Sequence, residues 1–333
     1  MKRTIHLGIL GAGGIARVFA STVRGMNEKD LGDVELTVVA ARDLSRAEEF
    51  ARKESVQRAY GSYEEMASDP EVDLIYIATP HSHHYEHAKL CIEHGKHVLC
   101  EKAFTVNARQ AQDICRRAKE AGVLITEAIW TRYQPMRKLI RDTLESGIVG
   151  KPSTLTANLS YSIAMNDRIV NPALAGGALL DVGVYTLNFA EMVFGRAKKV
   201  SASCVLTDRG VDRSDSMTLF WEDGRMAVLT AGTTSVSDRY GIIYCENGFI
   251  QVENINNPQK LEVYGSGRSK PELMKEISCP EQITGYEYEI MEAADAVRIG
   301  ALECESMPHD ETIHIMELMD HIRAQMGIHY EFE

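Results

Sequence analysis

The sequence lacks a disulfide framework, a paired-cysteine metal motif and a block of basic residues. Its seven cysteines are odd in number and scattered over 333 residues, and no CxxC pair occurs. This pattern favours reduced thiols in a cytoplasmic protein over a cross-linked secreted one. Lysine and arginine total 36 against 48 acidic residues, a net charge of −12 without a Lys/Arg cluster. That balance argues against nucleic-acid binding.

Long apolar runs and low-complexity segments are absent as well. We find no run that approaches the roughly 18–20 residues of a membrane span, and the opening MKRTIHLGIL is too short for a signal peptide. Hydrophobic residues at 44% and charged residues at 25% are ordinary globular values. Because 333 residues exceed one typical domain, we expect two domains and no membrane partner.

What the first third of the chain does contain is an alternation of short apolar runs with amphipathic patterns. TIHLGIL, VELTVVAA, DLIYIAT, HVLC and VLITEAI are separated by helical patterns such as ARQAQDICRRAKEAG. Such alternation predicts parallel strands joined by helical crossovers, an α/β sheet that is doubly wound and covered on both faces. We predict a Rossmann domain over residues 1–128.

Beyond about residue 128 the pattern changes to antiparallel strands. The dipeptides DG at 223–224 and NG at 247–248 join apolar strands, and they supply the positive φ angles that tight hairpins need. Helical patterns end the chain. We predict a second, α+β domain over residues 129–333, with a large, open and mostly antiparallel sheet.

A glycine-rich turn follows the first predicted strand. GAGGIA places Gly11, Gly13, Gly14, Ile15 and Ala16 between that strand and the first predicted helix. Gly11 permits the tight turn, Gly13 lets the backbone approach a pyrophosphate, and Ala16 allows close packing of helix on sheet. This context predicts a dinucleotide site, against the alternative of a glycine turn that binds nothing.

NAD-binding proteins typically have a carboxylate at the end of the second strand. At that edge this chain has Ala41 and then Arg42, within the segment AARD. Arg42 can stack on adenine and pair with a 2′-phosphate, which favours NADP. Asp43 is a competing ribose acceptor, but it fits equally well as the N-cap of the next helix. Ser45 and Glu48 also fit a capping box there. NAD therefore stays open as the cofactor.

Four motifs make the chain resemble the Gfo/Idh/MocA oxidoreductases over nearly its whole length. They are the GxGxxA turn, ATPHSHHYEHA for TPNxxH, CEKA for EKP, and GGALLDVGVY for GGGxxxDxGxH. Within the family, the chain most resembles the dimeric dihydrodiol dehydrogenases and the NADP-dependent D-xylose dehydrogenases. The shared segments include AARD, LCEK, EAIWTRY and MVFG. Two positions depart from the family motifs, since Ala103 replaces the proline and His81 replaces the asparagine.

The resemblance implies a catalytic set of Lys102, Tyr185 and Asp181. Tyr185 stands where the family often has a histidine acid/base. Lys102 would lower the pKa of that phenol, near 10 when free, and position the substrate oxygen. Asp181 lies four residues before Tyr185, on the same face of a predicted helix. The competing interpretations are a solvated lysine, a packed aromatic ring and an ordinary carboxylate at a helix N-terminus.

The resemblance also implies cofactor contacts beyond the glycine turn and Arg42. Among them, His84 would lie near the ribose, Glu101 would fix the backbone or touch the ribose, and Trp130 would lie near the nicotinamide. Trp130 also fits a plain core role between the domains. The residues concerned are Thr79, Pro80, His84, Glu101, Lys102, Trp130 and Arg132.

The resemblance points to hydride transfer between a nicotinamide and a CH–OH carbon. We expect a sugar, polyol or cyclic trans-diol substrate and, by resemblance, a homodimer formed through the antiparallel sheet. Histidines between positions 81 and 97 could supply metal ligands, but no cysteine or carboxylate completes a recognisable site, so we predict no metal. The alternatives are a nucleotide-binding regulatory protein without turnover and a glycosidase that borrows NAD transiently.

Overall fold

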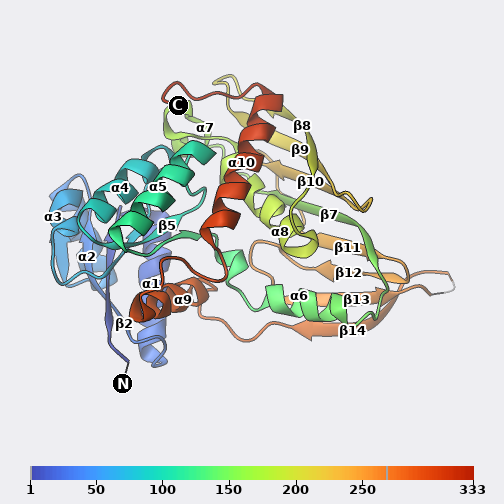
Figure 1. Ribbon diagram of the computed structural model, residues 1–333, viewed down its shortest axis with the longest axis horizontal. Helices are drawn as coiled ribbons and strands as arrows, with labels where there is room; N and C mark the ends of the chain where they lie inside the picture. The colour runs from blue at the N-terminus through green and yellow to red at the C-terminus, as the bar shows by residue number, and fades with distance from the viewer. Residues whose placement is uncertain (1, 268) are drawn as a thin grey trace. The chain divides into compact units, whose positions relative to one another are not determined.

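The computed structural model describes residues 2–267 and 269–333, which divide into two compact units (Figure 1). The first unit contains the chain up to Tyr133 together with Gln282–Met316, and the second contains Gln134–Glu281 and Glu317–Glu333. The predicted boundary at 128/129 lies close to Tyr133. The return of the chain to the first unit differs from the predicted division, because the patterns of the sequence do not mark it.

The first unit is built on a parallel sheet in the order β3-β2-β1-β4-β5-β6. Its strands are β1 (Ile5–Leu10), β2 (Val34–Ala40), β3 (Arg58–Tyr60), β4 (Leu74–Ile77), β5 (His97–Glu101) and β6 (Ile125–Ala128). The strand order reverses between β1 and β4, the place where doubly wound sheets bind ligands. The predicted Rossmann fold is confirmed.

Helices and 3-10 turns connect these strands. They are α1 (Gly14–Glu28), α2 (Leu44–Glu54), α3 (Tyr63–Ala67), α4 (His84–Glu93) and α5 (Ala108–Ala121), with the 3-10 turns η1 (His81–His83) and η2 (Trp130–Arg132) and, later in the chain, α9 (Glu287–Ile299). Asp43 caps α2 by accepting from the Ser45 N–H at 2.9 Å. The predicted capping box at Ser45 is wrong, because the carboxylate two residues earlier takes the cap position.

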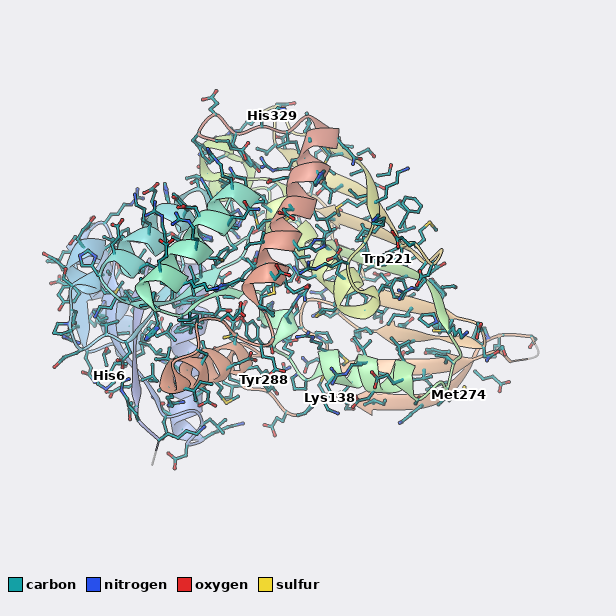
Figure 2. All side chains as sticks on the ribbon, viewed as in Figure 1. His6, Lys138, Trp221, Met274, Tyr288 and His329 are labelled. Atoms are coloured by element: carbon teal, nitrogen blue, oxygen red, sulfur yellow. The ribbon has the colours of Figure 1, made fainter. Side chains whose placement is uncertain are left out.

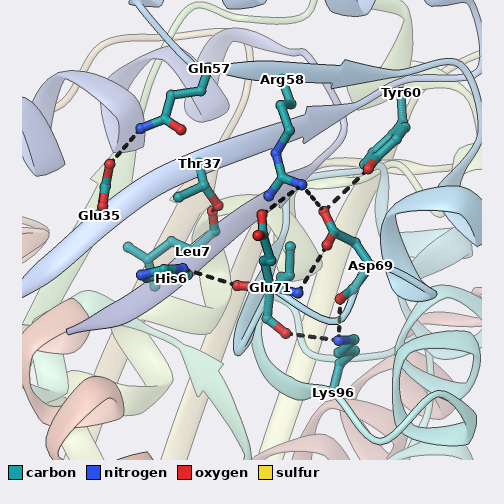
Figure 3. Close-up of polar contacts among 11 residues, drawn as sticks. His6, Leu7, Glu35, Thr37, Gln57, Arg58, Tyr60, Asp69, Glu71 and Lys96 are labelled. Atoms are coloured by element: carbon teal, nitrogen blue, oxygen red, sulfur yellow. Dashed lines mark hydrogen bonds and ion pairs between the residues drawn. The ribbon is translucent and has the colours of Figure 1, made fainter. Parts of the chain in front are cut away.

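A polar network holds the loop before β4 in the first unit (Figure 3). The Asp69 carboxylate accepts from Arg58 at 2.7 Å and from the Tyr60 hydroxyl at 3.2 Å. The buried Lys96 ammonium donates to the backbone carbonyls of Asp69 and of Val72, the latter at 2.9 Å. Each buried polar group here has a partner, as burial requires, and none of these residues belongs to the candidate site.

The second unit is built on a sheet in the order β14-β13-β12-β11-β7-β10-β9-β8. Its strands are β7 (Pro152–Ser160), β8 (Lys199–Leu206), β9 (Asp212–Phe220), β10 (Met226–Gly232), β11 (Gly241–Cys245), β12 (Gly248–Val252), β13 (Lys260–Gly265) and β14 (Glu272–Ser278). β7 and β10 pair in parallel and the other neighbours are antiparallel. The predicted α+β architecture and both predicted hairpins are confirmed.

Helices cover one face of the second sheet. They are α6 (Met136–Glu145), α7 (Asp167–Val170), the turns η3 (Pro172–Leu174) and η4 (Leu179–Gly183), and α8 (Val184–Phe194), while α10 (His309–Met326) crosses from one unit into the other. α8 packs on β7 and β10. The Gln325 side chain of α10 exchanges hydrogen bonds with the backbone of β8, accepting from Ala202 at 2.8 Å and donating to Val200 at 3.1 Å.

The segment Pro172–Phe194 is long and apolar enough to cross a membrane by length and composition, with a mean hydropathy of 1.3. This finding corrects the expectation that no run of that length exists. In the structure, 89% of its apolar window is buried, and its last part is α8. The core helix of a folded domain has the same properties, so we do not assign a membrane span.

Candidate active site

Neighbouring strands bring the candidate residues of the first unit to one edge of its sheet. β1 leads into the glycine turn, β4 leads into Thr79 and Pro80, and β5 ends at Glu101, directly before Lys102. β4 pairs in parallel with both β1 and β5, so the carboxyl ends of the three strands lie side by side. The structure therefore places these predicted residues together at the switch point of the sheet.

The glycine turn closes tightly against the end of β4. Gly11 has a φ of +108°, and a Cβ there would lie 2.9 Å from the Ala78 carbonyl oxygen. Gly13 is the N-cap of α1, while a Cβ on Gly14 would meet nothing within 4 Å. The first turn of α1 carries no acidic residue. An open helix N-terminus without negative charge fits the phosphates of a dinucleotide.

Arg42 and Asp43 have different surroundings in the structure. The Asp43 carboxylate accepts from the N–H and the hydroxyl of Ser45, at 2.9 and 2.8 Å, and these bonds lower its pKa. It is therefore engaged as a helix cap. Arg42 is exposed, and Arg46 in the first turn of α2 donates to the Ala12 carbonyl of the glycine turn at 3.4 Å. Two cationic side chains thus follow β2 at the edge where the glycine turn lies.

His84 is fully buried and joins the end of β4 to the segment after β5. Its Nδ1 lies 2.9 Å from the Ala103 carbonyl oxygen and its Nε2 lies 2.8 Å from that of Thr79. The two carbonyls favour the charged ring, but burial dominates and lowers the pKa of His84 to about 4. The peptide bond between Lys102 and Ala103 is cis. Within the described residues, no cluster of His, Cys, Asp and Glu could hold a metal ion.

Glu101 is buried and supports the backbone of the residue that follows it. Its carboxylate accepts from the Tyr76 hydroxyl and from the Lys102 N–H, the latter at 3.2 Å. Burial, and then the charge of Glu101, raise the pKa of Tyr76 well above its usual value, so the phenol stays a donor. These contacts agree with the interpretation that Glu101 fixes the backbone beside Lys102.

Glu127 is a second buried carboxylate at this edge, and the sequence analysis missed it. Its Oε1 accepts from the Phe104 N–H at 3.2 Å, two residues after Lys102. Burial raises the pKa of Glu127 to about 7, although the Arg132 guanidinium lowers it in part. A signal was present, since Glu127 interrupts the apolar run VLITEAI, and Glu101 follows the apolar run HVLC.

Trp130 and Arg132 have protein partners inside the first unit. The Trp130 ring stacks on Tyr286, with centroids 4.1 Å apart and an interplanar angle of 16°. Arg132 is buried, and its Nη1 lies 3.3 Å from Glu311 Oε2. Both contacts reach the returning segment after Gln282, so these side chains fasten that segment to the strands. Their contacts with a cofactor stay predictions.

Asp181 and Tyr185 lie at the start of the long buried helix of the second unit, and both are buried. The predicted regular helix is corrected, because Leu179–Gly183 is a π-helical segment, a feature frequent at functional sites. Asp181 Oδ1 lies 2.7 Å from Nη1 of Arg168, whose side chain is 48% exposed. No sequence pattern marked Arg168, because nothing in the segment around it distinguished it from a solvated arginine.

Comparison with known proteins identifies the family. Residues 5–129 match the description "Oxidoreductase family, NAD-binding Rossmann fold", and residues 137–267 match the "GFO/IDH/MocA C-terminal domain". A trans-1,2-dihydrobenzene-1,2-diol dehydrogenase from Danio rerio is 34% identical and covers 98% of both chains. The chain belongs to the Gfo/Idh/MocA oxidoreductase family. The Homo sapiens protein of the same name is 32% identical and covers 97% of both chains.

Two solved structures share this fold. KijD10, a 3-ketoreductase from Actinomadura kijaniata in complex with NADP and TDP-benzene, superposes with a TM-score of 0.87 at 23% identity, covering 97% of this chain and 98% of the other. An aldose-aldose oxidoreductase from Caulobacter crescentus superposes with a TM-score of 0.84 at 19% identity, covering 98% of both. At these identities the similarity shows the fold alone. The family predicted from the sequence motifs is confirmed.

Proposed function

We propose that this protein is an NADP(H)-dependent dehydrogenase that transfers hydride between the nicotinamide and a CH–OH carbon of a sugar, polyol or cyclic trans-diol. The observation that carries the proposal is the meeting of the glycine turn, Thr79-Pro80 and Lys102 at the switch point of one parallel sheet. The relatives named trans-1,2-dihydrobenzene-1,2-diol dehydrogenase support the diol as a substrate class.

The preference for NADP over NAD rests on the residues that follow β2. The Asp43 carboxylate is occupied by the α2 cap, so it is a poor acceptor for adenosine ribose hydroxyls. Arg42 and Arg46 offer two guanidinium groups, and guanidinium groups bind phosphate in paired hydrogen bonds. We propose that Arg42 pairs with the 2′-phosphate and that NAD, which lacks that group, binds more weakly.

Lys102 and Tyr185 form the proposed acid/base pair. When bound, the cofactor supplies the hydride acceptor. Tyr185, as the phenolate, takes the proton from the substrate hydroxyl, and the Lys102 ammonium stabilises that phenolate and orients the oxygen. Glu101 and Glu127 hold the backbone on either side of Lys102, through the N–H groups of Lys102 and Phe104. Arg168, which pairs with the buried Asp181 and is half exposed, offers a charged group to the substrate hydroxyls.

A cofactor titration followed by a substrate panel tests the proposal. Thermal shift with NADP and NAD gives the preference, because a ligand raises apparent stability with its concentration. Formation of reduced nicotinamide is then followed with trans-1,2-dihydrobenzene-1,2-diol, D-xylose and related polyols. We expect Tyr185→Phe and Lys102→Met each to lower turnover at least tenfold, with NADP affinity within threefold of wild type. Wild-type turnover in either variant would refute the role of that residue.

Two results of the same experiment would favour other functions. Cofactor binding without turnover of any alcohol in the panel would indicate a nucleotide-binding regulatory protein. Tightly held NAD without net formation of reduced cofactor would indicate transient oxidation, as in NAD-dependent glycosidases.

Arg52→Ala is the matched control for Arg42 substitutions, because it removes an exposed arginine from the last turn of α2.

We also propose that the uncovered face of the second sheet forms a homodimer in the cytoplasm. An aromatic row crosses β11, β12 and β13, where Phe249 stacks on Tyr264 with centroids 4.7 Å apart and lies 6.1 Å from Tyr244. Leu273 and Met274 on edge strand β14 are 53% and 54% exposed. Figure 2 labels Met274 on this strand. Light scattering should give twice the chain mass, and Phe249→Glu should give one chain mass. A monomeric wild type would refute the dimer.

The cytoplasmic location can be tested separately through the thiols. All seven cysteines are free in the structure. Cell fractionation should recover the protein with the soluble cytoplasmic enzymes, and alkylation after lysis should label its thiols without prior reduction. Recovery in an oxidised form outside the cytoplasm would refute this location.

A further inference from the structure

A β-bulge in β9 turns two aspartates toward the same buried face of the second sheet. Asp212 and Asp215 are three residues apart, so a regular strand would point them to opposite faces. The register with β8 passes from Val205↔Ser214 to Leu206↔Asp212, which leaves Arg213 as an extra residue on β9. The bulge restores a common face, and the two carboxyl residues are only 1% and 4% exposed.

Asp212 holds the turn that begins the helix of Asp181 and Tyr185. Its Oδ2 accepts from the Leu179 N–H at 2.5 Å, and the backbone of Ala178 bonds to the same carboxylate. Gly177 has a φ of +130°, and a Cβ on it would overlap Asp212 Oδ1. Glycine is therefore required at this position for the turn to close on the carboxylate.

Two neutral contacts anchor the other side of the same turn. The Tyr330 hydroxyl donates to the Gly176 carbonyl at 2.9 Å, and the Gly177 N–H donates to the Ile169 carbonyl at 2.8 Å. Asp212 is the carboxyl acceptor in this set, and its bonds go to the first residues of the helical segment. A hydrogen bond to a charged acceptor is stronger than one to a neutral acceptor.

Asp215 is the immediate partner of Asp212. In the part of the chain that the structure describes, neither Asp215 side-chain oxygen has a hydrogen-bond partner, and its charged neighbour is the Asp212 carboxyl. Two carboxyl groups share a hydrogen bond only when one of them carries the proton. The other titratable groups that face the pair are Cys204 on β8 and Tyr330, whose ring packs against Arg323. Burial raises the pKa of both, so they stay neutral at pH 7.

We propose that Asp212 is a positioning residue, which fixes the turn at Gly177 and thereby sets where Tyr185 stands. The inference rests on the proposed function only for its effect on turnover. Its structural part, the hold of one carboxylate on the start of the helix, can be measured without a substrate.

The experiment compares Asp212→Ala with Asp212→Asn, which keeps an accepting oxygen. Asp208→Asn is the control, because it changes an exposed aspartate in the same β8–β9 connection. Hydrogen exchange, read by mass spectrometry, should show the amides of 178–185 exchanging at least tenfold faster in Asp212→Ala and within threefold of wild type in the other two variants. kcat should fall at least tenfold in Asp212→Ala, with NADP affinity within threefold, and Asp212→Asn should restore it.

Unchanged exchange and unchanged kcat in a folded Asp212→Ala protein would overturn the inference. If Asp212→Ala does not fold, Asp212→Asn tests the inference instead. A tenfold loss of kcat in Asp212→Asn at an unchanged melting temperature would overturn the inference, because this variant keeps an accepting oxygen. If Tyr185→Phe keeps full turnover while exchange responds as expected, the proposed function fails and the positioning contact stands. The two failures are thus distinguishable.

Discussion

Glu127→Gln should make the protein more stable at pH 8 than wild type and leave it nearly unchanged at pH 5. Glu127 is fully buried and accepts from the Phe104 N–H, and burial raises its pKa from 4.5 to about 7. The folded state therefore keeps a proton between pH 4.5 and 7 that the unfolded state releases. In that interval the free energy of unfolding falls as pH rises.

The magnitude follows from the size of the shift. One pKa unit corresponds to about 1.4 kcal/mol, so the interval from 4.5 to 7 corresponds to about 3 kcal/mol of lost stability. Glutamine cannot ionise, and its amide oxygen still accepts from the Phe104 N–H. The substitution should therefore remove the pH-dependent part and keep the hydrogen bond that holds the backbone after Ala103.

Urea unfolding at pH 5 and at pH 8 measures this difference. The advantage of Glu127→Gln over wild type should grow by about 3 kcal/mol between the two pH values. Glu93→Gln, an exposed glutamate at the end of α4, is the control and should give equal differences at both. An advantage that does not change with pH would refute the assignment of a proton to Glu127 in the folded protein.

Three other substitutions test the cofactor site, the substrate site and the carboxyl pair. Arg42→Ala should weaken NADP at least tenfold and NAD less than threefold in calorimetric titration, and an equal loss for both would contradict the 2′-phosphate assignment. Arg168→Ala should lower kcat/KM about tenfold without changing NADP affinity, because Asp181 loses its partner, whereas unchanged kinetics would remove Arg168 from the site. The melting temperature should fall less between pH 5 and pH 8 in Asp215→Asn than in wild type, since the pKa of Asp215 is raised in the folded state. A slope equal to wild type would show that Asp215 does not hold a proton.

The sequence by itself determined the fold of the first unit and the position of its site. Apolar runs of strand length between amphipathic patterns admit few arrangements other than a parallel sheet with crossovers. The carboxyl ends of adjacent strands then fall at one edge, so Gly11, Thr79 and Lys102 could be placed together from their order along the chain. The role of Asp43 as a cap was among the two possibilities that local spacing allowed.

Which charges are buried, and which groups they hold, depends on the folded chain. Three features depend on contacts that form only when the chain folds. They are the return of Gln282–Met316 to the first unit, the raised pKa of Glu127 and the pairing of Asp181 with Arg168. The bulge that turns Asp212 inward exists only in the register of β9 against β8. Local patterns report periodicity and backbone preference, whereas burial and partner choice are set by neighbours that the chain meets after it folds.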